Sequence, residues 1–202
     1  MPAARPKSAE ASVSVVRPAP HERILEVARE LFCRDGIHAT GIDSILAEAS
    51  ASKMTLYSRF GSKEGLLKEV LAREGDAQRE AIFAVIDAAG PDPVQRLHAA
   101  VHGLRVWFGS DRFYGCAFMN AAAEHTKGAA GEPWLRELTK THHAAILGRL
   151  SSLAAEAAYA EPELLARQIL LIMDGAIAAL MVSGDKQVLA ISERNLKAVL
   201  AR

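Results

Sequence analysis

Residues 40–60 read TGIDSILAEASASKMTLYSRF, and this stretch decides the fold. Its first half places apolar residues at the i, i+3, i+4, i+7 spacing of one helix face, at Ile42, Ile45, Leu46 and Ala49. A short break and a second helical segment, residues 53–60, follow. Two short helices joined by a tight turn form the unit that places its second helix in the major groove of DNA.

The second helix of this unit carries a dense set of polar side chains. Hydroxyl groups and the heads of Lys and Arg suit phosphate oxygens, and Lys or Arg also reaches guanine edges. Residues 50–63 contain three basic residues and no acidic residue. A helical hairpin with a solvated polar face remains the alternative. The DNA-contacting residues that we predict are Thr40, Ser52, Lys53, Met54, Thr55, Tyr57, Ser58, Arg59 and Lys63.

These motifs resemble the TetR family of bacterial transcriptional regulators. The resemblance covers about 45 residues, from the helix that begins near Arg23 to the Phe-Gly-Ser-Lys-Glu run of residues 60–64. It implies that Thr40, Thr55, Tyr57 and Lys63 face DNA. It also implies a homodimer on double-stranded operator DNA and a small-molecule effector. The chain departs from the family at Ser50, where glycine is usual, at Met54, where glycine is common, and at Arg59, where histidine is common.

Helical periodicity continues through the rest of the chain, and we find no strand pattern of useful length. The fold class is therefore all-α, with nine helices in a TetR-like architecture. We expect a flexible N-terminal arm over residues 1–18, a helix-turn-helix domain over 19–65, and an effector-binding and dimerisation domain over 66–202.

The composition limits the class of protein. The 202 residues are 50% hydrophobic and 24% charged, with 24 basic and 24 acidic residues and no net charge. This excludes a disordered or collagen-like chain and argues against binding of nucleic acid by bulk charge, but permits a local basic face. The longest apolar stretch, Leu164–Val182, contains Arg167, Gln168 and Asp174, which favours a core helix over a membrane span. We expect a cytoplasmic protein with no membrane partner.

The last two helices carry more apolar surface than one helical bundle needs, which favours a dimer interface, although an intramolecular core explains the same pattern. The interface residues that we predict are Leu165, Ile172, Ala176, Ala179, Leu180, Leu189, Leu196 and Val199.

Aromatic residues concentrate between residues 107 and 118, which favours an apolar effector pocket, with a core cluster as the alternative. Asn120 and Glu124 share a helix face and either meet the ligand or brace the break at Gly115. Asp174 either bonds a neighbouring helix or anchors the ligand. The absence of an obvious Lys or Arg points to an uncharged or weakly polar effector. The lining residues that we predict are Trp107, Phe108, Phe113, Phe118, Met119, Asn120, Glu124, His125, Met173 and Asp174.

Other chemistries have weaker support. The histidines near residues 125 and 142 lack metal-ligand spacing, so we expect no metal, and nothing in the sequence calls for a cofactor. No catalytic motif supports an enzyme. Cys116 begins a helix, where the helix dipole lowers a thiol pKa, so a redox-sensing regulator is one alternative. A helical small-molecule-binding protein without operator specificity is the other.

Overall fold

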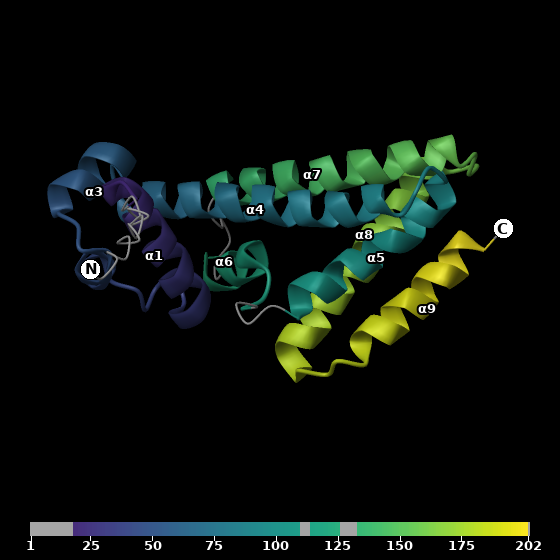
Figure 1. The fold of residues 1–202 in the computed structure, drawn as a ribbon. Helices are drawn as coiled ribbons and strands as arrows, with labels where there is room; N and C mark the ends of the chain where they lie inside the picture. The colour runs from purple at the N-terminus through teal and green to yellow at the C-terminus, as the bar shows by residue number, and fades with distance from the viewer. Residues whose placement is uncertain (1–17, 110–113, 126–132, 202) are drawn as a thin grey trace, which may run out of the picture.

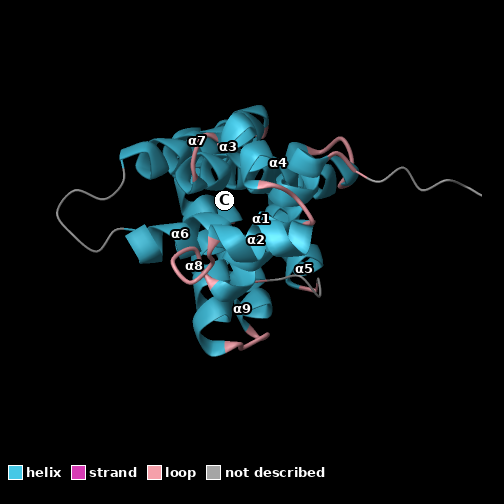
Figure 2. Ribbon diagram, turned by 90° about the vertical axis from the view of Figure 1, so that its left-hand side faces the viewer, coloured by secondary structure: helices cyan, strands magenta, loops and turns pink. Residues whose placement is uncertain are grey.

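The computed structural model describes residues 18–109, 114–125 and 133–201, and every regular element among them is a helix (Figures 1 and 2). The helices are α1 (Pro20–Asp35), α2 (Ile42–Ala49), α3 (Lys53–Phe60), α4 (Lys63–Ala88), α5 (Pro93–Phe108), α6 (Ala117–His125), α7 (Pro133–Glu156), α8 (Pro162–Ser183) and α9 (Val188–Leu200). The all-α prediction is confirmed.

Side-chain caps explain where several helices begin. Ser52 accepts a hydrogen bond from the backbone N–H of Thr55, and Ser62 accepts one from Gly65. Asp92 caps α5 in the same way, with proline at the first helical position. The Ser52 and Ser62 caps mark the starts of α3 and α4, and thereby define the short links on either side of α3.

The first three helices pack around a small core. Ile24 and Ala28 of α1, Ile45 of α2 and Leu56 of α3 are all fully buried. Leu56 is the only buried residue of α3, so this helix is held by one side and presents the other to solvent. Ser50 ends α2 with a backbone φ of 48°, in the left-handed region that favours glycine. Glycine is the usual residue at this position in the proteins that the sequence resembles.

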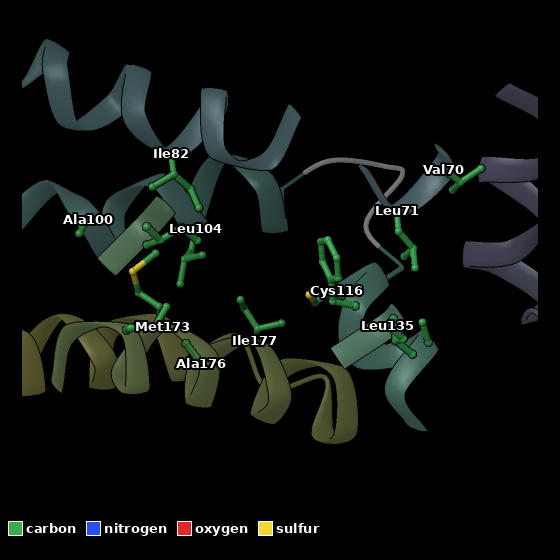
Figure 3. Close-up of a cluster of buried hydrophobic side chains, with 14 of the residues drawn as sticks. Val70, Leu71, Ile82, Ala100, Leu104, Cys116, Leu135, Met173, Ala176 and Ile177 are labelled. Atoms are coloured by element: carbon green, nitrogen blue, oxygen red, sulfur yellow. The ribbon is translucent and has the colours of Figure 1, made fainter. Parts of the chain in front are cut away.

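The remaining helices form a larger bundle. The long helices α4 and α7 run away from the α1–α3 end, and α5, α8 and α9 pack at the far end (Figure 1). Helix α6 lies between α1 and that bundle and contacts α4 and α7. Met173 of α8 lies beside Leu104 of α5 in the buried cluster (Figure 3). Helix α4 continues without a break across residues 65 and 66, so it belongs to both parts of the protein.

Helix α8 has two apolar faces. By length and composition alone it could cross a membrane, but one face, with Ile169 and Met173, is buried against α7 and α9. The expected core helix is therefore present. The opposite face is exposed and carries a stripe of apolar or small residues at heptad-like spacing, which we call the α8 stripe: Leu164, Leu171, Gly175, Ala178 and Val182.

Half of the predicted dimer residues are buried within the single chain. Leu165, Ala176, Leu189 and Leu196 are between 1% and 8% exposed, so they belong to the core of the single chain. Of the other predicted residues, Ala179 is exposed and Ile172, Leu180 and Val199 are half-buried. Because both faces of α8 are apolar, periodicity alone does not distinguish the face that packs in the single chain from the face that is exposed.

Candidate nucleic-acid interface and adjoining cavities

Helix α3 presents a polar, exposed surface at one end of the molecule (Figure 1). Met54 is 79% exposed and Tyr57 is 48% exposed, whereas Leu56 between them in the helix is fully buried. Lys53, Ser58 and Arg59 are also exposed, and Thr55 is half-buried. The predicted residues of this helix thus share one accessible surface.

Several of these side chains already have partners. Lys53 forms an ion pair with Asp43 of α2 at 2.9 Å, and this hydrogen bond raises the pKa of Lys53. Arg59 lies 3.7 Å from Glu69 of α4. The Ser58 hydroxyl donates to the carbonyl oxygen of Thr55. The two ion pairs are largely exposed, and such pairs contribute little free energy, so a DNA phosphate can replace the carboxylate partners with little loss.

A residue that the sequence did not single out braces the turn between α2 and α3. The guanidinium of Arg23 in α1 donates to the carbonyl oxygens of Ala49 and Ser50, each at 2.9 Å. These carbonyls end α2, where intrahelical donors are lacking. Arg23 therefore ties α1 to the end of α2, just before α3 begins. The sequence shows a basic residue in α1 but not the carbonyls that it meets.

Thr40, which we predicted to contact DNA, is buried in the turn between α1 and α2. Its side chain is only 4% exposed, and its hydroxyl donates to the carbonyl oxygen of Gly36 at 2.7 Å. The hydroxyl completes the turn between α1 and α2 and is turned away from solvent. The prediction that this hydroxyl meets a phosphate is therefore not supported by its position.

Lys63, which we predicted to contact DNA, has a partner within the chain. Its ammonium group donates to the carbonyl oxygen of Ile37 at 2.6 Å and lies 6.0 Å from the ring centroid of Phe32. The side chain is half-buried. Lys63 thus ties the start of α4 to the turn between α1 and α2, a structural contact that the sequence did not predict.

The same turn is also held by a residue of α6. The Glu124 carboxylate in α6 accepts from the backbone N–H groups of Ile37 and His38, at 2.9 and 2.8 Å. Gly36, with φ of +92°, lies so close that an added Cβ would be 3.3 Å from the carboxylate. The rings of His38 and His125 meet edge to face at 5.0 Å. We call this contact between α6 and the α1–α2 turn the Glu124 latch.

Replacing Glu124 with glutamine is expected to lower the free energy of unfolding by about 1–2 kcal/mol. The amide has only one acceptor oxygen, so one of the two N–H groups loses a charge-assisted bond. Urea unfolding followed by circular dichroism measures the change. Glu137→Gln, which removes an exposed carboxylate from α7, is the matched control and should change little. Equal stability of the wild type and the Glu124 variant would show that the latch contributes nothing.

The residues predicted for an effector pocket do not converge on one cavity. Two of them, Trp107 and Phe118, line a cavity of about 140 Å³ between α4, α5 and α6. Its other lining residues are Glu74, Ala77, Gln78, Ala81, Ile82, Gly103 and Ala117. His125 lines a different cavity of about 160 Å³ beside His38, Lys63 and Trp134. Phe113 lies outside the described residues.

The other predicted lining residues have structural partners. The Asn120 amide donates to the carbonyl oxygen of Tyr114, which braces the break before α6. Glu124 holds the α1–α2 turn instead of a ligand. Met173 is 2% exposed within the core, and Asp174 lies 3.8 Å from the His143 ring of α7. Burial raises the pKa of Asp174. Phe108 and Met119 are half-buried and pack against the core.

Cys116 is 5% exposed and belongs to the buried cluster of Figure 3. Its thiol receives backbone hydrogen bonds at the start of α6, but burial has the larger effect and raises its pKa. Burial therefore outweighs the lowering of this pKa that the start of the helix provides. A buried thiol that stays protonated is a poor redox sensor.

Comparisons with known proteins agree with this geometry. Residues 24–70 match the family described as bacterial regulatory proteins, tetR family. The transcriptional activator FasR of Mycolicibacterium smegmatis is 38% identical over 79 residues, which is 39% of this chain and 36% of FasR. The regulator QacR of Staphylococcus aureus is 39% identical over 59 residues, or 29% of this chain and 31% of QacR. These alignments thus span about a third of each relative.

Solved structures extend the likeness to the whole fold. A TetR-family regulator from Streptomyces coelicolor superposes with a TM-score of 0.79 at 28% identity, covering 90% of this chain and 94% of its own. A regulator from Streptomyces avermitilis gives 0.71 at 26% identity, covering 92% of this chain and all of its own. Residues 24–70 thus carry the helix-turn-helix of the tetR family, and nine-tenths of the chain shares the fold of a TetR-family transcriptional regulator.

Proposed function

We propose that this protein is a cytoplasmic, dimeric repressor that binds a palindromic operator through α3 and releases it when a small effector binds. The observation that carries the proposal is the α3 surface. One buried side chain, Leu56, anchors the helix, while Tyr57 and two basic residues are exposed and no acidic residue lies between positions 50 and 63. FasR is named as an activator, so repression is our proposal and not a property taken from the relatives.

The dimer is proposed from the α8 stripe. A helix of eight residues reads only a few base pairs, so a two-fold dimer is needed to bind two half-sites about 34–36 Å, or a multiple of this, apart. The α8 stripe supplies exposed apolar surface, and Gly175 and Ala178 allow close approach of a second helix.

The effector is proposed to act through α6 and the start of α4. Phe118 of α6 lines the 140 Å³ cavity, and Glu124 of the same helix holds the α1–α2 turn. A shift of α6 on ligand binding would therefore move the DNA-binding domain and change the separation of the two α3 helices. By linkage, the ligand weakens DNA binding by the same factor as DNA weakens ligand binding.

The test is a titration of the protein against its own upstream intergenic DNA, followed by fluorescence anisotropy at two salt concentrations. We expect saturable, sequence-dependent binding by a dimer that weakens at the higher salt concentration. Equal affinity for upstream and random DNA would contradict operator binding and favour a helical small-molecule-binding protein. A promoter fusion that rises in a deletion strain would support repression, and one that falls would indicate activation.

Replacing Asp43 with asparagine is expected to tighten DNA binding about three- to tenfold at low salt. The change removes a negative charge beside α3 and frees Lys53 for phosphate, and the gain should shrink as salt screens the charges. Anisotropy at several salt concentrations measures it. Glu156→Gln, an exposed change at the far end of α7, is the control. Weaker binding by the Asp43 variant would mean that Asp43 orients Lys53 instead of competing for it.

A further inference from the structure

The cavity between α4, α5 and α6 carries one charged side chain. Glu74, Ala77, Gln78 and Ala81 face it at helical spacing from α4, and Trp107 and Phe118 add aromatic surface. None of its described lining residues is Lys or Arg. The wall is therefore apolar and aromatic, with one carboxylate and one amide.

Glu74 has only a weak partner among the described residues. Its carboxylate lies 3.5 Å from the guanidinium of Arg29 in α1, at the limit of a hydrogen bond. Arg29 is held more closely by Glu26, at 2.8 and 3.2 Å. Burial raises the pKa of Glu74 in spite of Arg29. A second cation would therefore stabilise the Glu74 carboxylate, and Arg29 would keep its bonds to Glu26 if it were displaced.

The aromatic part of the lining is tightly packed and carries no positive charge among the described lining residues. Phe118 is stacked on His142 with ring centroids 4.5 Å apart, and it packs against Gly75, where an added Cβ would be 3.1 Å from the ring. His142 accepts from Arg79, and burial lowers its pKa to about 4, so its ring is neutral near pH 7. Aromatic rings beside a carboxylate suit an organic cation.

We propose that this cavity binds a small organic amine, with its ammonium group on Glu74 and its apolar part against Trp107 and Phe118. The size of the cavity, about 140 Å³, lies below the range of about 300–1,000 Å³ that holds drug-sized ligands, so the amine is small. This proposal names the effector class for the proposed function and rests on it. It replaces the uncharged effector expected from the sequence, which did not place Glu74 in the cavity.

The site also suggests how the amine is sensed. Glu74 belongs to α4 and Arg29 to α1, so the Glu74–Arg29 pair joins these two helices, as the Glu124 latch joins α6 to the α1–α2 turn. An ammonium group that takes Glu74 removes this contact. The amine therefore weakens the hold of α4 on α1.

Isothermal titration calorimetry on the full chain without DNA tests the proposal. The probes are 2-phenylethylamine, the neutral 2-phenylethanol and the anionic phenylacetate, which share a similar shape. We expect the amine to bind at least about tenfold more tightly than either of the others. Equal binding of the three, or no binding of the amine at millimolar concentration, would overturn the proposal.

Variants locate the binding. Glu74→Gln should abolish the preference for the amine, whereas Glu80→Gln, which removes an exposed carboxylate of the same helix, should retain it. Ala81→Leu keeps the charge but fills the cavity, so it should block the amine, and it remains informative if the Glu74 variant folds poorly. Full amine binding by both Glu74→Gln and Ala81→Leu would place the ligand elsewhere. The titration contains no DNA, so amine binding can be established even if the protein fails to bind an operator. Operator binding can likewise be established even if the amine fails to bind.

Discussion

Replacing Tyr57 with alanine is expected to lower the affinity for operator DNA by about 100-fold. One lost contact to DNA costs about 1–3 kcal/mol, and a symmetric dimer carries the substitution in both half-sites. Tyr57 is 48% exposed and is not part of the buried core, so the fold should not depend on it. The effect should therefore fall on binding alone.

Fluorescence anisotropy with the operator measures the loss, and thermal unfolding verifies that the variant is folded. Tyr57→Phe separates two contributions: it removes the hydroxyl that suits a phosphate oxygen but keeps the ring. An intermediate loss would assign part of the affinity to that hydroxyl. Wild-type affinity of the alanine variant, with a normal unfolding curve, would rule out α3 as the DNA-reading helix.

The sequence predicted local structure closely because local rules determine it. The bounds expected for α2 and α3 agree with the structure, since the apolar spacing and the Ser52 cap lie within a few residues of each helix end. The start of α5 is equally local, as Asp92 and Pro93 mark it. Such signals need no knowledge of the rest of the chain.

The sequence could not reveal partners that are distant along the chain. Lys63 meets a carbonyl 26 residues away, and Glu124 meets backbone N–H groups 86 and 87 residues away. A sequence shows which side chains are charged, but backbone groups look alike at every position. For the same reason Glu74 looks like part of a solvated face of α4, until the fold brings Trp107 and Phe118 beside it.

Replacing Leu171 with glutamate is expected to raise the dissociation constant of the dimer at least about 100-fold. Leu171 is 73% exposed in the single chain and lies within the α8 stripe. If two stripes pack about a two-fold axis, the substitution brings two unpaired carboxylates into an apolar interface, which costs several kcal/mol. Sedimentation velocity over a range of protein concentrations measures the dissociation constant.

Two further variants make the interpretation specific. Ala84→Glu places the same charge on an exposed position of α4 and should leave the dimer intact. Gly175→Leu adds bulk but no charge, and a Cβ at Gly175 would meet no heavy atom of its own chain within 4 Å. This variant should therefore fold normally yet keep the two α8 helices apart.

The dimer variants also test how α3 reads DNA. A monomer meets one half-site with one short helix, so Leu171→Glu should lose most of its operator affinity although its α3 surface is unchanged. Its remaining binding should equal that of the wild type on a single half-site. If the Leu171 variant stayed dimeric and bound the operator normally, the α8 stripe would not be the interface, and the two-fold spacing of the α3 helices would have to come from another surface.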